Sequence, residues 1–477
     1  MWYSSQSVSG LAPILQAATV QEATLKRATR KARSPRYHNV LVWYQLANRA
    51  RDKIGGALVA LSWLGATSLA HAEGTPRLDT GDTAWVLIST ALVLMMTVPG
   101  LALFYAGMVR KKNILGTMAH SLGAAALVSV VWVVAGYSLA FSHGALNPFI
   151  GGLDNAFLAG IGVQDVTGTI PTLLYVGFQM TFAIIAVAIL AGSLAERMKF
   201  GSFMVFSALW LLLVYAPVCH WVWGGGWLMG DGAMDFAGGT VVHINAGMAG
   251  LVLASVLGHR QGYGRVFMAP ANLTLTMVGT GLLWVGWFGF NAGSALGANG
   301  LAANALLVTQ VSAASGALTW FGLEKLMRAK SSVLGGASGA VAGLVGITPA
   351  AGFVSIGGAL WIGILTTVVC YFSVHYLKRV HKIDDTLDAF GLHGVGGIVG
   401  ALLTAVFVSP AVTGQPLATG LLHRLWIQAA GVLATLVYCG AVTWLIAKVV
   451  QKTLGLRLDD EAEYEGMDLA IHGEKIE

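Results

Sequence analysis

Charged residues are scarce in this chain of 477 residues: only 10% are Asp, Glu, Lys or Arg, whereas a soluble globular domain carries about 25%. Because 56% of the residues are hydrophobic, this scarcity indicates a membrane protein. Cysteine is also rare, and Cys219, Cys370 and Cys439 lie in apolar stretches without the spacing of a metal site or a disulfide framework. The net charge of +6 comes from basic residues in short loops and at the N-terminus, which excludes a nucleic-acid-binding patch.

The first 72 residues differ from the rest of the chain. Residues 1–50 are polar and basic, and we interpret them as a leader or as the result of a misassigned start. Residues 51–72 have the outline of a cleaved signal peptide: basic residues, an apolar run over 55–69, and Ala70-His71-Ala72 as a small-x-small cleavage site. The alternative is a short membrane anchor that is not cleaved.

Apolar stretches of about 20 residues, the length that crosses about 30 Å of hydrocarbon, recur further along the chain. They predict a membrane domain of eleven transmembrane helices over 82–452, followed by a polar tail over 453–477. The predicted spans are 83–108, 114–142, 170–195, 201–223, 239–258, 270–291, 302–327, 333–348, 353–377, 387–408 and 423–450. The eighth span is short.

Loop charge orients these spans, because Lys and Arg favour the cytoplasmic side. Basic residues follow every odd-numbered span, beginning with Arg110, Lys111 and Lys112. The alternate loops contain no Lys or Arg: 143–169, 224–238, 292–301, 349–352 and 409–422. The pattern predicts an N-terminus outside and a C-terminus inside, in agreement with a cleaved signal peptide.

An internal repeat relates the fifth and tenth spans. Asp235 precedes His243 by eight residues, and Asp385 precedes His393 by the same interval. Glycines follow each histidine at +4 and +7: Gly247, Gly250, Gly397 and Gly400. The two spans start on opposite sides, so we predict an all-α integral membrane protein built as an inverted 5+5 repeat plus an additional helix, with its site near the bilayer midplane.

His243 and His393 are candidate pore residues, because ionisable groups inside a membrane usually face a cavity or each other. The repeat would bring the two imidazoles to one depth, where one ring N–H donates to the other ring's bare nitrogen. The alternatives are that each histidine only satisfies a backbone carbonyl, or that the pair binds a metal ion. The pair lacks a third metal ligand, so we expect no metal and no cofactor.

Asp235 lies at the outer start of the fifth span and has two interpretations. A carboxylate there can cap the free N–H groups of a helix N-terminus. It can also help to attract a cation to the outer mouth of a pore. The sequence leaves both open.

Aromatic residues crowd the same outer side, and an aromatic face binds a small cation by about 0.5–2 kcal/mol. Each one alone is explained by packing or by an interfacial aromatic belt. Together with two polar residues they outline a cation vestibule: Phe178, Phe182, Trp221, Trp223, Trp227, Trp287, Phe290, Asn291 and Ser294.

From about residue 81 to the end, the chain resembles the ammonium transporter family of the Amt/Rh class, and more closely its bacterial Amt branch. The resemblance is carried by FYAGMVRKKN, FQMTFAIIAVAILAGSLAERMKF, HWVWGGGWL, DFAGGTVVHINAGMAGL, GWFGFNAGS, GLVGITPAAGFV, DAFGLHGVGGIVG and GLRLDDEAEYEGMDLAIHGE. Residues 1–50 have no counterpart in the family's pattern.

The resemblance implies a homotrimer in the bacterial inner membrane with one eleven-helix pore per subunit. It implies an outer ammonium-binding site made of Trp223, Phe182, Ser294 and Phe178. Below this site it implies a gate of Phe182 and Phe290, a twin-histidine pore of His243 and His393, and Asp235 as the acidic residue of recruitment or deprotonation. A PII-type cytoplasmic signal protein is the implied partner of the tail.

We expect ammonium to be held by the aromatic cup, to lose its proton, and to pass the imidazoles as ammonia, because a bare charge is costly in hydrocarbon. A rival hypothesis is an ammonium sensor that signals through the PII-type partner. An intramembrane hydrolase using His243, His393 and Asp385 is disfavoured, because no motif supplies a nucleophile and Asp385 lies about 12 Å of helix from His393. We therefore predict a transporter and not an enzyme.

Overall fold

The computed structural model describes residues 77–476. The predicted leader over 1–50 and signal peptide over 51–72 lie outside the described residues. Residues 77–476 belong to one compact unit of the chain.

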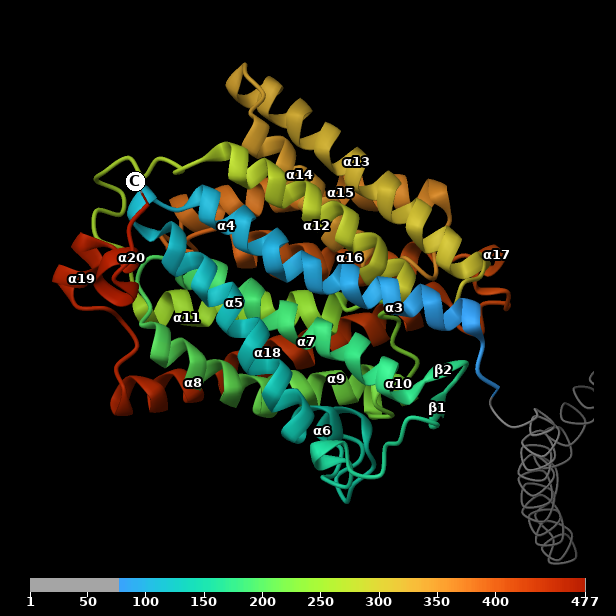
Figure 1. Cartoon of the computed structure of the whole chain (residues 1–477). Helices are drawn as coiled ribbons and strands as arrows, with labels where there is room; N and C mark the ends of the chain where they lie inside the picture. Colours follow the sequence, from blue (N-terminus) through green and yellow to red (C-terminus); the bar gives the residue numbers. More distant parts are fainter. Residues whose placement is uncertain (1–76, 477) are drawn as a thin grey trace, which may run out of the picture. The chain divides into compact units, whose positions relative to one another are not determined.

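The described chain is almost entirely helical (Figure 1). Several of the long helices contain a wider or tighter turn. Its first half contains α3 (Thr80–Met95), η2 (Met96–Leu101), α4 (Ala102–Met108), η3 (Lys111–Asn113), α5 (Ile114–Val131), η4 (Trp132–Gly136), α6 (Tyr137–Phe141), η5 (Ala156–Leu158), α7 (Thr172–Leu194), α8 (Phe200–Trp210), η6 (Leu211–Tyr215), α9 (Ala216–Trp223), α10 (Trp227–Gly230), η7 (Gly239–Ile244) and α11 (Asn245–Leu257). A two-stranded antiparallel hairpin of β1 (Val166–Thr167) and β2 (Ile170–Pro171) precedes α7.

The second half continues the bundle and ends in two short tail helices. It contains α12 (Leu273–Gly293), α13 (Gly300–Arg328), α14 (Val333–Ile347), α15 (Ile356–Arg379), η8 (Phe390–Gly394), α16 (Val395–Phe407), α17 (Pro410–Thr413), α18 (Leu421–Thr453), α19 (Asp460–Glu465) and α20 (Met467–His472).

Within residues 77–476, ten helices are long and apolar enough to cross a membrane. Each of the ten overlaps one span predicted from the sequence. Most of the helix ends lie within a few residues of the predicted ends. The predicted eighth span corresponds to α14, an apolar helix of 15 residues that falls below the length of the other ten. Its buried face is lined by small residues that pack on α13 and α15, so close packing inside the bundle accounts for this helix better than contact with lipid.

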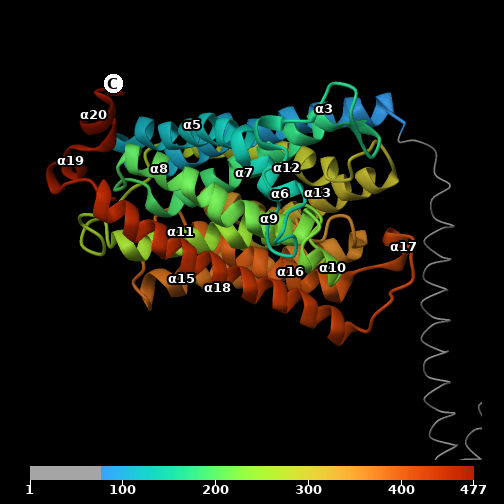
Figure 2. The same ribbon diagram turned by 90° about the horizontal axis from the view of Figure 1, so that it is seen from below.

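The long helices lie side by side and run between two ends of the bundle (Figures 1 and 2). The tail helices α19 and α20 lie at one end, and the β-hairpin, α10 and α17 lie at the other. α3 begins at the end opposite the tail. α7, which is the most buried of the spans, packs against α3, α5 and α11 and forms the centre of the core.

Candidate functional site

The two histidines of the repeat meet in the core of the bundle. His243 and His393 lie with their Nδ1 atoms 3.2 Å apart and their ring centroids 5.2 Å apart. Both are buried, with 1% and 4% of their surface exposed. A 3.2 Å contact between ring nitrogens requires one Nδ1–H to donate to the bare Nδ1 of the other ring, so both imidazoles are held in complementary tautomers. The buried Nε2 of His243 has no hydrogen-bond partner among the described residues.

Each histidine lies in a widened helical turn that starts beside a buried aspartate. Asp235 accepts four backbone N–H groups at the start of η7, with N–O distances of 2.6–3.1 Å: those of Gly238, Gly239, Thr240 and Val241. Asp385 accepts three at the start of η8, at 2.8–3.4 Å, together with a hydroxyl: Ala389, Phe390, Gly391 and the Ser193 Oγ–H. Both carboxylates therefore cap the free N–H groups of a helix N-terminus.

Two opposed effects act on the pKa of the Asp235 carboxyl. Burial raises the pKa of its carboxyl above the ordinary value, and the four N–H bonds act against that rise. The bonds to both oxygens leave little free acceptor capacity on this carboxylate.

The repeated glycines allow the two histidine-bearing helices to touch through their backbones. A Cβ at Gly247 would lie 2.4 Å from the backbone nitrogen of Gly394, and a Cβ at Gly397 would lie 2.9 Å from the carbonyl oxygen of Gly239. A larger side chain at either +4 position would push η7 and η8 apart. The +7 glycines make similar contacts with other helices, because Gly250 packs on Ser193 and Gly400 on the Gly346 backbone.

A column of aromatic rings leads from the bundle surface to the histidines. The Phe182 ring meets Trp223 edge-on with centroids 5.8 Å apart, and it meets Phe178 at 4.9 Å. It stacks on Phe290 at 4.2 Å with an interplanar angle of 20°. Phe290 in turn lies 5.9 Å from the His243 ring. Phe182 and Phe290 are fully buried, whereas Trp223 is partly exposed, so the column runs from an accessible mouth into the core.

Two polar groups are fixed at this mouth. The Trp223 indole N–H donates to the Asp235 carbonyl oxygen at 2.8 Å, which holds the ring in place. The Ser294 hydroxyl donates to the Phe290 carbonyl oxygen at 2.8 Å, so the lone pairs of its oxygen stay free to accept a hydrogen bond. Ser294 is half-buried at the end of α12, and the adjacent Gly293 packs against the Phe178 ring.

Not all of the residues grouped with the vestibule in the sequence lie there. Trp221 and Trp227 pack on each other at 6.0 Å, and the Trp221 N–H donates to the Phe149 carbonyl, away from the Phe182 ring. Asn291 donates to Thr309 Oγ1 at 2.9 Å and so belongs to the contact between α12 and α13.

Trp287, which the sequence groups with the vestibule, lies instead against the imidazole pair. Its ring stacks on His243 with centroids 5.4 Å apart, and its N–H donates to Thr348 Oγ1 at 2.8 Å. The signal was present in the spacing, since Trp287, Phe290 and Ser294 recur at intervals of three and four and therefore share one face of α12.

A second cluster of buried charges lies at the tail end of the bundle. Glu196 bridges Arg110 and Arg260 at 2.7 and 3.3 Å, and Arg260 also binds Asp384 at 2.8 Å. Burial alone would raise the pKa of the Glu196 and Asp384 carboxyls, but the guanidinium groups lower both below their ordinary values. Arg197 donates to the Asp384 carbonyl at 2.7 Å. The cluster thus ties together loops from four parts of the chain beside Asp385.

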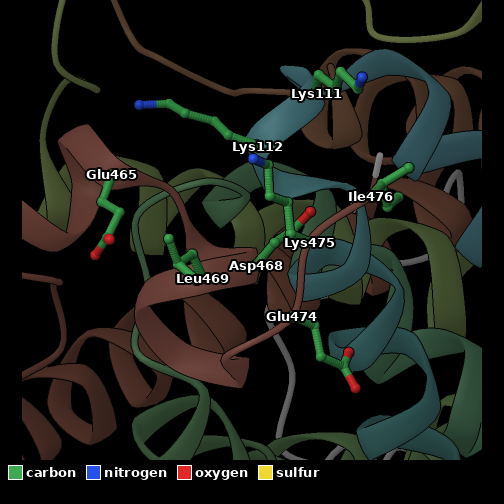
Figure 3. Close-up of a pocket in the computed structure, with 8 residues that line it drawn as sticks. All are labelled: Lys111, Lys112, Glu465, Asp468, Leu469, Glu474, Lys475 and Ile476. Carbon is green, nitrogen blue, oxygen red and sulfur yellow. The ribbon is translucent and has the colours of Figure 1, made fainter.

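The tail is docked on this same end. Asp468 Oδ1 accepts the Gly116 N–H at 2.8 Å, and Asn113 Oδ1 accepts the Met467 N–H at 2.9 Å. Glu463 binds Arg457 at 2.7 Å and accepts the Gln261 N–H. Between tail and bundle, charged side chains of both signs surround a pocket of about 250 Å³ (Figure 3): Lys111, Lys112, Glu465, Asp468, Glu474 and Lys475, with Leu469 and Ile476.

A bundle of ten apolar helices long enough to cross a bilayer, with a hydrogen-bonded imidazole pair in its core beneath a column of aromatic rings, defines a multi-pass membrane protein with a buried polar site. Residues 84–476 match the model of the Ammonium Transporter Family. The chain belongs to the ammonium transporter family.

Similar proteins agree with this assignment. An ammonium transporter of Aquifex aeolicus is 49% identical over 86% of this chain and 96% of its own length. An ammonium transporter of Bacillus subtilis is 49% identical over 83% of this chain and 98% of its own length. The crystal structure of Saccharomyces cerevisiae Mep2 superposes with a TM-score of 0.75 at 35% identity, covering 81% of this chain and 89% of Mep2. A structure titled Sensor Amt Protein superposes with a TM-score of 0.77 at 29% identity, covering 82% and 98%. The matched family and these curated relatives are transporters and not enzymes.

Proposed function

We propose that this protein carries ammonium into the cytoplasm as ammonia, through a hydrophobic pore at His243 and His393. Its membership of a family of ammonium transporters supports the substrate. The observation that carries the pathway is the continuous column of rings from Trp223 to His393.

The outer site consists of Trp223, Phe182, Phe178 and Ser294. Phe178 and Trp223 both lie edge-on to the Phe182 ring, and a cation is attracted to an aromatic face. Ser294 supports recognition of ammonium in particular, because its oxygen accepts an N–H bond that potassium cannot donate. Asp235 acts here through structure, by fixing the start of η7 and the Trp223 ring.

Below the outer site, Phe182 and Phe290 form the gate. Their stacked rings offer neither a donor nor an acceptor, so a solute that passes them is stripped of its hydration. A bare ammonium ion would pay a large desolvation penalty at this depth, whereas ammonia is neutral. We therefore place loss of the proton above the gate, where solvent water at the partly exposed Trp223 accepts it as hydronium and leaves neutral ammonia. The imidazole pair then offers a solute both a donor and an acceptor.

We propose that the chain crosses the membrane eleven times, with α14 as the short eighth crossing. The crossings form an inverted 5+5 repeat followed by α18. The matched aspartate caps and histidine positions of η7 and η8 support the repeat. The N-terminus of the domain lies outside and the tail inside, because the basic loops cluster at the tail end. Residues 82–452 form the transporter domain and 453–477 the regulatory tail, after a leader (1–50) and a signal peptide (51–72).

The proposal includes a homotrimer and a PII-type signal protein that docks at the tail end of the bundle. The pocket of Figure 3 and the docked tail offer charged groups of both signs to such a partner. A sensor that signals through this partner is the second candidate, favoured by the likeness to the structure titled Sensor Amt Protein. Ammonium-dependent currents and net ammonium uptake in liposomes that contain no PII-type protein would support a transporter over a sensor.

Solid-supported-membrane electrophysiology on proteoliposomes, given ammonium pulses with and without a pH gradient, tests the proposal. We expect a response to ammonium that exceeds the response to potassium. Replacing both His243 and His393 by Leu should abolish flux or this discrimination. His423→Ala, which removes an exposed imidazole at the start of α18, is the matched control and should leave both unchanged. Normal flux and discrimination in the double variant would refute the pore assignment.

A further inference from the structure

A polar cavity of about 330 Å³ lies where the ends of α13 and α15 meet the start of α14. These three helices pack side by side (Figure 1). Six ionisable and two hydroxyl side chains line the cavity, and its lining residues are distinct from those of the column that leads from Trp223 to His393. Asp388, in the short stretch between Asp385 and η8, also lines it, so the cavity lies at the tail end of the bundle.

Both carboxylates in the lining already have partners. Asp388 Oδ1 accepts a bond from the Lys378 ammonium group at 2.7 Å. Glu324 accepts the Ser332 N–H at 2.6 Å and the Ser332 hydroxyl at 3.1 Å, at the start of α14. The negative charge of the lining is therefore committed to neighbouring groups of the chain.

Two guanidinium groups of the lining have no carboxylate partner. Arg328 ends α13 and Arg379 ends α15, and within residues 77–476 neither has a carboxylate oxygen within 4.0 Å. Arg328 contacts Nε2 of His375, whose Nδ1–H donates to the Tyr371 carbonyl oxygen at 2.7 Å, so this imidazole is a neutral acceptor. The other N–H groups of both guanidinium groups can bind an anion, and their planar fork suits the oxygens of a phosphate.

A buried donor beside the cavity also lacks a partner. Trp320 lines the cavity with 5% of its surface exposed, and its ring lies edge-on to Tyr371 with centroids 5.2 Å apart. Its indole N–H has no hydrogen-bond partner among the residues that the structure describes. A buried donor is costly when unpaired, and an oxygen held in the cavity pairs it directly or through one water. The start of α14 adds the positive end of a helix dipole, which favours an anion in the same place.

We infer that this cavity is a binding site for a small soluble oxyanion of the phosphate type. Arg328 and Arg379 hold its oxygens by charge-assisted bonds, and the Trp320 N–H adds a neutral one. With Lys378, the three cations of the lining exceed its two carboxylates by one charge, which attracts an anion. The polar lining suits a soluble ligand better than a phospholipid, because an acyl chain is stabilised by apolar walls.

Equilibrium binding of radiolabelled inorganic phosphate to the purified, delipidated full chain tests the inference, in detergent and in chloride buffer of constant ionic strength. We expect one saturable site per chain. Arg328→Gln and Arg379→Gln should each weaken binding about tenfold, because each removes charge-assisted bonds to the anion. Trp320→Phe keeps an aromatic ring but removes the N–H, and should weaken binding about fivefold.

Two nearby lysines supply matched controls. Lys330→Gln and Lys382→Gln each remove a positive charge from an exposed position that does not line the cavity, and should leave phosphate binding unchanged. Absence of saturable binding, or equal losses in the lysine and arginine variants, would overturn the inference. Displacement of phosphate by phosphatidylglycerol in mixed micelles would assign the cavity to a lipid headgroup and also overturn it. Arg328 and Arg379 are exposed, so their variants decide the outcome even if Trp320→Phe does not fold, and the readout does not depend on transport.

Discussion

Replacing Asp235 by Asn tests whether its carboxylate caps the start of η7 or acts directly on the cation. The carboxylate accepts two N–H groups on each oxygen, from Gly238 and Gly239 on one and from Thr240 and Val241 on the other. An amide offers one acceptor oxygen and turns an NH₂ group towards the other two donors. Two charge-assisted bonds are lost, each worth about 1.5–3 kcal/mol, but removing a buried charge offsets part of this, so we expect a loss of stability that stays below about 6 kcal/mol.

Thermal unfolding of the detergent-solubilised protein, followed by intrinsic fluorescence, measures this loss. Asp231→Asn is the matched control, because Asp231 is exposed in the same loop. We expect a clearly lowered unfolding midpoint for Asp235→Asn and an unchanged midpoint for the control. A variant as stable as the control would refute the capping role. If that stable variant were also inactive in transport, the carboxylate would act on the cation itself.

Three further outcomes are expected. Ser294→Ala should raise the ammonium concentration at half-maximal current about tenfold, because it removes one bond to a charged ligand, while the maximal current stays unchanged. Because the pKa of Glu196 is lowered in the folded protein, its stabilising effect is present above about pH 4.3 and is lost as the pH falls through the lowered value. The thermal unfolding midpoint of Glu196→Gln should therefore fall less steeply with decreasing pH than that of the unchanged protein. Glu463→Gln should increase proteolysis of the tail, because Arg457 loses its carboxylate partner.

The positions of the long helices could be predicted from the sequence, because each needs a run of apolar residues that matches the bilayer thickness. The short segment 333–348 was the weakest of the predicted spans, and α14 is the one apolar helix of the set with only 15 residues. The length of an apolar run is a weak guide to such a helix, since contacts with α13 and α15 replace contact with lipid.

The spacing of Asp235, His243, Asp385 and His393 predicted that both imidazoles would lie at the same depth, and the structure brings them within hydrogen-bond distance. The sequence could not choose between a capping and a recruiting carboxylate, because that choice depends on where four backbone N–H groups point. The widened turns of η7 and η8 also escaped prediction, since residue periodicity does not encode a single turn of altered pitch.

The charge cluster at the tail end was not predictable either. Glu196, Arg260 and Asp384 are far apart in the chain, and each alone has the appearance of an ordinary loop residue. Only the packing of three loops on one another brings them together and excludes water from them. Long-range contacts of this kind leave no local periodicity to detect.

The backbone contact between Gly247 and Gly394 makes the imidazole pair sensitive to a single methyl group. A Cβ 2.4 Å from a backbone nitrogen must withdraw by about 1 Å to reach ordinary van der Waals contact. The ring nitrogens are already 3.2 Å apart, so a similar displacement of one helix would break their bond. A glycine without any side-chain chemistry thereby determines whether the two imidazoles can form their hydrogen bond. Gly247→Ala would separate the two halves of the repeat where their backbones touch.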